Sequence, residues 1–130
     1  KVLKIAALSV ILLSFLACTP SLVPSGWELL GKREVGFGVD HDAITVPAQK
    51  GTFSKLLVVV RMNDLELYDI RVTFESGADF SPNFRGKFIA NRDTQIIDLP
   101  GAARRIRRVD FRYRSLLRTA RRAVVELYGK

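Results

Sequence analysis

Arginine is the side chain with the clearest chemical potential in this sequence, and it gathers near the C-terminal end. Between Gly101 and Lys130 there are ten basic and two acidic residues, whereas Cys18 to Pro100 has nine basic and eleven acidic ones. The planar guanidinium can hold a phosphate or a carboxylate through two parallel hydrogen bonds. We therefore predict a basic face that contacts an anionic partner. Its candidate residues are Arg105, Arg107, Arg108, Arg112 and Arg114.

The spacing of apolar residues indicates how these arginines are held. Val109, Phe111 and Tyr113 alternate with charged residues, which predicts a strand with one face toward a core and the charges on the other. A slip in the alternation after Ile106 predicts a bulge. At a rise of about 3.3 Å per residue, Arg105–Arg114 would extend over roughly 30 Å. The alternative to a binding surface is a solvated face whose arginines pair with nearby carboxylates.

A second polar group is the triplet Asp40, His41 and Asp42, just before the predicted strand Ala43–Val46. Carboxylates at alternate loop positions suit a hard cation such as calcium, and an imidazole suits a transition metal. A calcium site needs six or more oxygen ligands, which this triplet alone does not offer. We therefore expect an Asx-type turn, with a metal or small-ligand site as the alternative. No cofactor is expected.

Groups suited to catalysis are few. His41 is the only histidine and Cys18 the only cysteine, so a Ser-His-Asp or Cys-His arrangement would depend on them. There is no G-x-S-x-G elbow, no phosphate-binding glycine loop and no zinc-ligand spacing. We expect a protein without enzymatic activity, and weak hydrolase activity is the alternative attached to the Asp40–Asp42 loop.

The first seventeen residues have the pattern of a signal peptide. Lys1 and Lys4 are followed by an apolar run from Ile5 to Ala17, shorter than the ~18 residues that indicate a spanning helix. Ala17 and Cys18 resemble the lipobox of bacterial lipoproteins, and the resemblance implies a lipid on the sulfur of Cys18. The alternatives are ordinary cleavage to a soluble protein and a retained membrane helix. We expect an exported protein, membrane-anchored in the periplasm or at the cell surface, and at the outer membrane if the host has one.

After a tether over residues 18–26, residues 27–130 have the composition of a single domain. Short apolar or alternating segments separated by turn formers predict an all-β fold, an antiparallel β-sandwich of jelly-roll type with about seven or eight strands. Leu56–Phe74 is predicted to be a hairpin with a turn at Asn63 and Asp64 and a bulge at Tyr68 and Asp69.

The remaining strands are predicted from the same patterns. They are Trp27–Phe37, Ala43–Val46, Gln95–Leu99, Arg105–Arg114 and Ala123–Tyr128. Ser115–Val125 has apolar residues close to helical spacing, but we favour a connecting loop or a single turn there.

Several motifs spread over the predicted domain point to one family. They are WELLG, DHDAITV, VTFESG, IDLPG, RRIRRVDFRY and VELYG. Together they resemble an uncharacterised family of small exported bacterial β-sandwich proteins. The resemblance implies export and an all-β fold, and it implies no reaction.

The predicted export limits which anionic partners are available to the basic face. Anionic lipid, acidic wall polymer and an acidic protein would all suit the arginines, and nucleic acid would suit them chemically as well. Export argues against nucleic acid. Two hypotheses follow: a lipid-anchored module that holds an anionic envelope component, and a domain that binds a metal or small ligand through Asp40–Asp42.

Overall fold

The computed structural model describes residues 21–116 and 121–130. Within them, nine strands form two antiparallel sheets. Sheet A has the order β1 (Glu28–Glu34), β9 (Val124–Gly129), β3 (Lys55–Arg61) and β7 (Thr94–Asp98). Sheet B has the order β2 (Val39–Thr45), β8 (Ile106–Ser115), β4 (Leu65–Phe74) and β5 (Asp79–Phe80), and β6 (Gly86–Phe88) also pairs with β4. Among the residues that the structure describes, the only helical turn is η1 (Ala48–Lys50).

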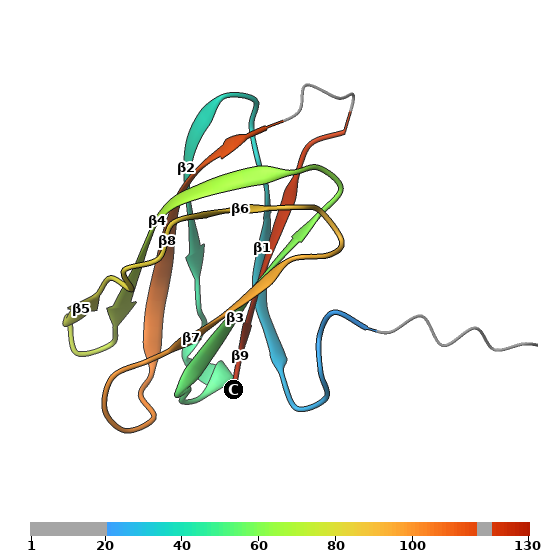
Figure 1. Ribbon diagram of the computed structural model, residues 1–130. Coiled ribbons are helices and arrows are strands. Elements are labelled where there is room, and N and C mark those ends of the chain that lie inside the picture. Colours follow the sequence, from blue (N-terminus) through green and yellow to red (C-terminus); the bar gives the residue numbers. More distant parts are fainter. Residues whose placement is uncertain (1–20, 117–120) are drawn as a thin grey trace, which may run out of the picture.

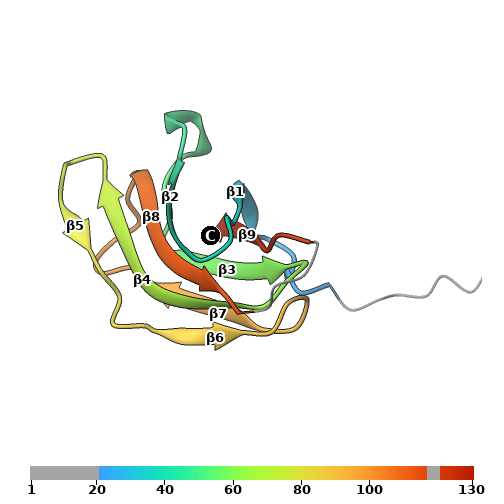
Figure 2. The same ribbon diagram turned by 90° about the horizontal axis from the view of Figure 1, so that it is seen from above.

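The chain passes from one sheet to the other at almost every connection. β1, β3, β7 and β9 lie in sheet A, while β2, β4 and β8 lie in sheet B, and only β4, β5 and β6 follow one another in the same sheet. Figures 1 and 2 show the two layers facing each other. This arrangement is a jelly roll, in which two Greek keys wrap two sheets around one core. The predicted antiparallel β-sandwich is confirmed.

The core lies between the sheets and is filled by alternate residues of the strands. Leu56, Val58 and Val60 of β3 enter it from sheet A, and Val109, Phe111 and Tyr113 of β8 enter it from sheet B. Each of these side chains is at most 1 % exposed. The predicted inward face of the Arg105–Arg114 segment is therefore confirmed.

Two predicted irregularities are present in the pairing of β4 with β8. Leu67 faces Tyr113 and Asp69 faces Arg112, so Tyr68 is the extra residue of a bulge. Thr73 faces Arg108 and Phe74 faces Ile106, so Arg107 is the extra residue of another. Because Leu67 and Ile70 both point into the core, the first bulge leaves Tyr68 and Asp69 together on the outer side.

The prediction of a hairpin over Leu56–Phe74 is wrong, because β3 and β4 belong to different sheets. The segment between them does turn at Asn63 and Asp64, but it packs against other loops instead of closing a ladder. Asn63 is buried and its amide donates to the carbonyl of Arg121, while Asp64 Oδ1 accepts from the backbone of Ala90. A turn signal marks a reversal of direction and does not say which sheet receives the next strand.

Other boundaries differ by a few residues. β2 begins at Val39, so Asp40–Asp42 lie inside a strand and the prediction of a loop before Ala43 is wrong. β5 and β6 were not predicted because strands of two and three residues are too short for an alternation to show. β8 ends at Ser115 and β9 begins at Val124; residues 117–120, the middle of the predicted connecting loop, lie outside the described residues.

Candidate anion-binding face

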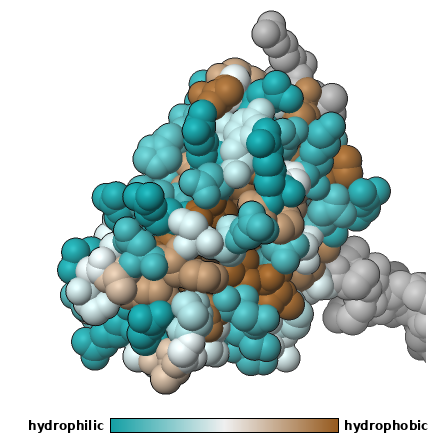
Figure 3. Space-filling model, turned by 60° about the vertical axis from the view of Figure 1, so that its left-hand side comes forward, coloured by the Kyte–Doolittle hydropathy of each residue, from teal (hydrophilic) through white to brown (hydrophobic). Residues whose placement is uncertain are grey.

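The outer face of sheet B carries the predicted basic residues. Because neighbouring strand residues point to opposite sides, Arg108, Asp110, Arg112 and Arg114 of β8 face away from the core. Figure 3 brings the side of β2, β4 and β8 forward and shows mostly hydrophilic side chains over it, with smaller hydrophobic areas between them. The arginines of β8 therefore contribute to a polar surface.

A shallow recess of about 290 Å³ lies on this face. Its walls come from three strands that lie side by side, with β8 in the centre. The lining residues are His41, Asp69, Arg71, Arg108, Asp110, Phe111 and Arg112. We call this hollow the arginine recess. Three arginines line it from two strands, and each guanidinium can hold a phosphate or carboxylate through two parallel hydrogen bonds.

A second hollow adjoins the arginine recess. It measures about 400 Å³ and shares Asp69 and Arg112 with the first, so the two form one elongated depression. Tyr68 and Arg85 line the second hollow, and the Arg85 guanidinium lies 4.7 Å from the centre of the Tyr68 ring. The bulge at Tyr68 is what places this ring on the outer face beside Asp69.

Asp110 organises the floor of the arginine recess. The residue is 8 % exposed, and its two oxygens have different partners. Arg108 Nε donates to Oδ2 at 3.0 Å, and His41 Nε2 lies 3.4 Å from Oδ1. One buried carboxylate thus fixes both Arg108 and His41 at the rim.

Arg71 and Arg112 are arranged differently. Within residues 21–116 and 121–130, neither guanidinium makes an ion pair or a hydrogen bond. Arg71 faces Asp110 across the β4–β8 ladder, and Arg112 faces both His41 and Asp69 across its two ladders. Their positive charges are therefore available to a ligand that enters the recess.

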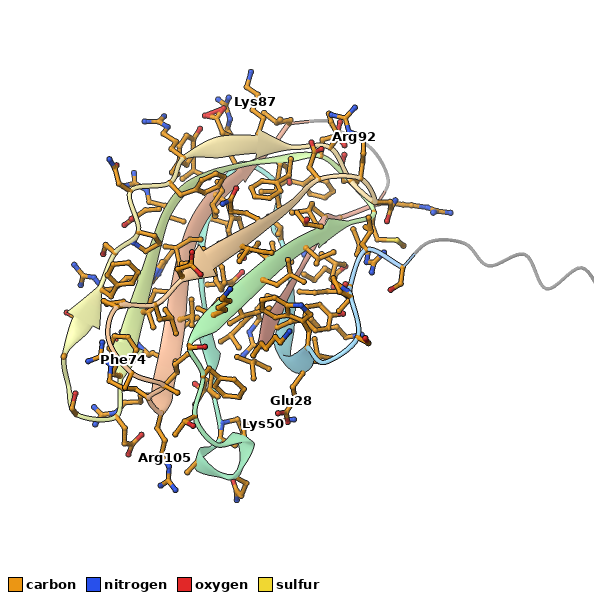
Figure 4. All side chains as sticks on the ribbon, turned by 60° about the horizontal axis from the view of Figure 1, so that its bottom comes forward. Glu28, Lys50, Phe74, Lys87, Arg92 and Arg105 are labelled. Atoms are coloured by element: carbon orange, nitrogen blue, oxygen red, sulfur yellow. The ribbon has the colours of Figure 1, made fainter. Side chains whose placement is uncertain are left out.

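The structure divides the five predicted arginines. Arg108 and Arg112 line the arginine recess, whereas Arg107 donates to the carbonyl of Glu75 at 3.0 Å. Arg105 precedes β8 and points away from the domain, at the end opposite Lys87 and Arg92 (Figure 4). Arg114 lies opposite Glu66 in the ladder. The predicted basic face is thus divided into a central pair, Arg108 and Arg112, and three flanking residues.

The triplet Asp40, His41 and Asp42 does not converge on one point. Strand alternation places Asp40 and Asp42 on the inner side of β2 and His41 on the outer side. Asp40 accepts from the backbone of Gly36 and His41, and Asp42 accepts the hydroxyl of Tyr113. In the part of the chain that the structure describes, no group of three or more His, Cys, Asp or Glu residues is placed to hold a metal.

The Tyr113 hydroxyl is the most perturbed titratable group on these strands. Its burial raises the pKa of the phenol well above the usual value, and the hydrogen bond to Asp42 raises it further. The phenol therefore stays protonated and continues to donate to the Asp42 carboxylate. This bond ties β8 to β2 on the side facing the core.

A comparison with models of protein families identifies the family of this chain. A family model described as a domain of unknown function, DUF2541, matches residues 5–129. The chain belongs to the DUF2541 family. No curated protein and no solved structure matched the chain. The DUF2541 assignment supports the expected resemblance to an uncharacterised domain family and covers both sheets.

Two site residues of this DUF2541 domain were not predicted from the sequence. Arg71 is separated from the C-terminal arginines by more than thirty positions, and only the β4–β8 ladder brings it to them. Tyr68 was predicted to lie in a bulge but not to belong to the site. Bulges are known to redirect side chains near functional sites, so the predicted bulge was a signal that could have indicated Tyr68. The segment RRIRRVDFRY contains Arg108, Asp110 and Arg112.

The predicted lipid-attachment residue Cys18 and the leader at residues 1–17 lie outside the described residues. Within the described ones, no helix is long and apolar enough to cross a membrane.

Proposed function

We propose that this DUF2541 domain is a non-enzymatic binding module of the cell envelope that holds an anionic ligand in the arginine recess. The observation that carries the proposal is the convergence of Arg71, Arg108 and Arg112 on one hollow of about 290 Å³. In the same proposal, Cys18 is lipidated after export and keeps the module at a membrane.

The chemistry of the recess indicates the kind of ligand. Two of its three guanidinium groups lack ion pairs among the described residues, so phosphate or carboxylate oxygens would supply the missing acceptors. Asp69 and His41 are also at the rim, and they can bond to hydroxyl groups. A ligand that combines an acidic group with hydroxyls, such as one unit of an acidic wall polymer, therefore fits best.

The shape of the face supports an extended ligand over a single ion. The adjoining hollow of about 400 Å³ continues the depression past Arg112 to Tyr68. An aromatic ring beside a positively charged groove offers a surface on which a sugar or another flat group can pack. The next unit of a polymer would occupy this second hollow.

The test compares two double variants with equal loss of charge. Arg71→Gln with Arg112→Gln removes the two guanidinium groups of the recess, and Arg105→Gln with Lys87→Gln removes two exposed cations outside it. Binding to immobilised polyphosphate and to polyglutamate is measured over a range of salt. Each charge-assisted hydrogen bond contributes about 1.5–3 kcal/mol, so we expect at least a tenfold loss for the recess variant and less than about threefold for the control.

Equal losses in the two double variants would show that the ligand responds to the overall field of the protein and not to the recess. Binding that is unchanged by the recess variant and by salt would remove the proposal, because exposed charge contacts are screened over a Debye length of about 8 Å. The anchor is tested separately, by mass spectrometry of the mature N-terminus and by release of Cys18→Ser from the membrane fraction.

A further inference from the structure

The outer face of sheet A differs from that of sheet B by carrying an apolar band. The β-ladders align Leu29, Tyr128, Leu57 and Ile96 in one row across all four strands. The next row contains Val59 beside Glu126. Leu57 and Val59 point away from the core between the sheets, yet they are only 1 % and 0 % exposed.

The edges of this band remain open. Leu29 on β1 is 40 % exposed and Ile96 on β7 is 49 % exposed. An adjacent row on the same face pairs Lys55 with Asp98, and Lys130 Nζ lies 5.9 Å from the centre of the Trp27 ring. The surface therefore combines aromatic rings, aliphatic side chains and lysines.

The N-terminal part of the domain leaves from this side. Residues 21–27 lie on the side of β1 and β9 that faces away from sheet B (Figures 1 and 2). The hydroxyl of Ser21 bonds the carbonyl and the N–H of Val23, and Leu22 and Val23 are half-buried. The described part of the chain thus begins at Ser21, three positions after Cys18.

Chain geometry then limits how far Cys18 can be from this face. Three residues of extended chain span at most about 11 Å. A lipid on Cys18 would bring the bilayer surface within that distance of Ser21. The effective concentration of lipid next to sheet A would therefore be high, and weak contacts would be enough to hold the domain in one orientation.

We propose that the outer face of sheet A rests on the surface of the lipid bilayer. The inference rests on the lipid anchor of the proposed function. Trp27 and Tyr128 lie at the level of the headgroups, where amphipathic rings are favoured, and Leu29 and Ile96 contact the outermost acyl carbons. Lys130 meets anionic headgroups and contributes attraction at short range, whereas the charge of Lys55 is balanced by Asp98 at 3.8 Å.

This orientation separates the membrane from the arginine recess. The two sheets of a sandwich are about 10 Å apart, and their outer faces point in opposite directions. With sheet A on the bilayer, the recess on sheet B faces away from it. The ligand of the recess is then a component in the surrounding compartment and not a headgroup of the anchoring membrane.

The test uses Trp27, the only tryptophan of the chain, as the probe. Lipidated protein is reconstituted in vesicles of phosphatidylethanolamine and phosphatidylglycerol, with brominated acyl chains as the quencher. We expect strong quenching of Trp27 fluorescence. Ile96→Glu should reduce it, because the charge replaces an exposed apolar contact on sheet A, whereas Thr45→Glu on the outer side of sheet B should leave it unchanged.

The outcomes separate this proposal from the one on which it rests. Lipid on Cys18 together with unquenched Trp27, or equal effects of the two glutamate variants, would overturn the orientation while the anchor stands. Absence of lipid on Cys18 would overturn both. Circular dichroism checks the folding of the variants, and both substitutions are at exposed strand positions outside the core.

Discussion

The two outer faces of the sandwich differ most at their centres. Sheet A has Leu57 and Val59 at its centre, fully buried although they lie outside the core between the sheets. Sheet B has Arg108 and Arg112 there, with Asp110 between them. The sequence of β3, five apolar residues in succession, is typical of a strand covered on both faces, whereas β8 alternates. One fold thus has apolar residues at the centre of one outer face and charged residues at the centre of the other.

The largest effect is expected on the sheet A side. Leu57→Ala removes buried methyl groups from a packed site, and we expect the free energy of unfolding to fall by about 2–4 kcal/mol. Ile96→Ala, in the same row but 49 % exposed, should cost less than about 1 kcal/mol. Urea denaturation of both variants measures the difference. Equal losses would mean that Leu57 is not part of a packed layer.

The next effect concerns the carboxylate at the centre of sheet B. Asp110→Asn removes the negative charge and replaces one accepting oxygen with an NH2 donor, so the contacts with Arg108 and His41 weaken. We expect the free energy of unfolding to fall by about 1–3 kcal/mol. The control is Asp98→Asn on sheet A, whose side chain is 79 % exposed and pairs with Lys55 at 3.8 Å. That change should cost less than about 0.5 kcal/mol. A loss at Asp98 as large as that at Asp110 would contradict the organising role of Asp110.

The contrast between β3 and β8 also explains how far sequence reasoning reaches. Alternation is a local property, so it predicted the inward face of β8 and both bulges of the β4–β8 ladder. Sheet membership is set by distant pairing, and for this reason the segment Leu56–Phe74 was mistaken for a hairpin. The turn residues Asn63 and Asp64 do not indicate which sheet the following strand joins.

The candidate site likewise combines features that are local in the sequence with features that depend on distant strand pairing. The C-terminal arginines could be found as a cluster along the chain, but the hollow depends on which side chains meet across ladders. Arg71 enters from β4 and His41 from β2, and neither is near Arg112 in the sequence. The prediction for Asp40–Asp42 placed three polar residues in a loop, where β2 instead separates them by alternation.

A smaller, pH-dependent effect is expected from the core side of sheet B. Burial and Asp42 raise the pKa of Tyr113 in the folded state, so its stabilising contribution is complete below the unfolded value of about 10 and is lost as the pH rises above it. Tyr113→Phe should cost about 1 kcal/mol at neutral pH. The variant should then lose less stability than the native chain between pH 7 and pH 10.5. Urea denaturation at the two pH values measures this.

Tyr128 on sheet A provides a comparison for the alkaline effect expected at Tyr113. The pKa of Tyr128 is also raised, first by burial and then by Glu126, so Tyr128→Phe should change the alkaline stability in the same direction. Tyr113 is fully buried and Tyr128 only partly, and the effect at Tyr113 should be the larger. If the native chain and Tyr113→Phe lose equal stability at alkaline pH, the phenol is not protected in the fold.

The smallest change in stability is expected at Arg112, a residue of the proposed binding site. Arg112 is exposed and, among the described residues, has no ion pair, so Arg112→Gln should alter the free energy of unfolding by no more than about 0.5 kcal/mol. Arg112 shares the recess with Arg71 and Arg108 but lies opposite Asp69, so the repulsion and the attraction lost in the variant largely cancel, and its stability should remain nearly unchanged at low salt. Denaturation at 20 mM and 500 mM salt tests this. A clear loss of stability would mean that Arg112 has a structural role, whereas unchanged stability with weakened polyphosphate binding is what a residue held for a ligand should show.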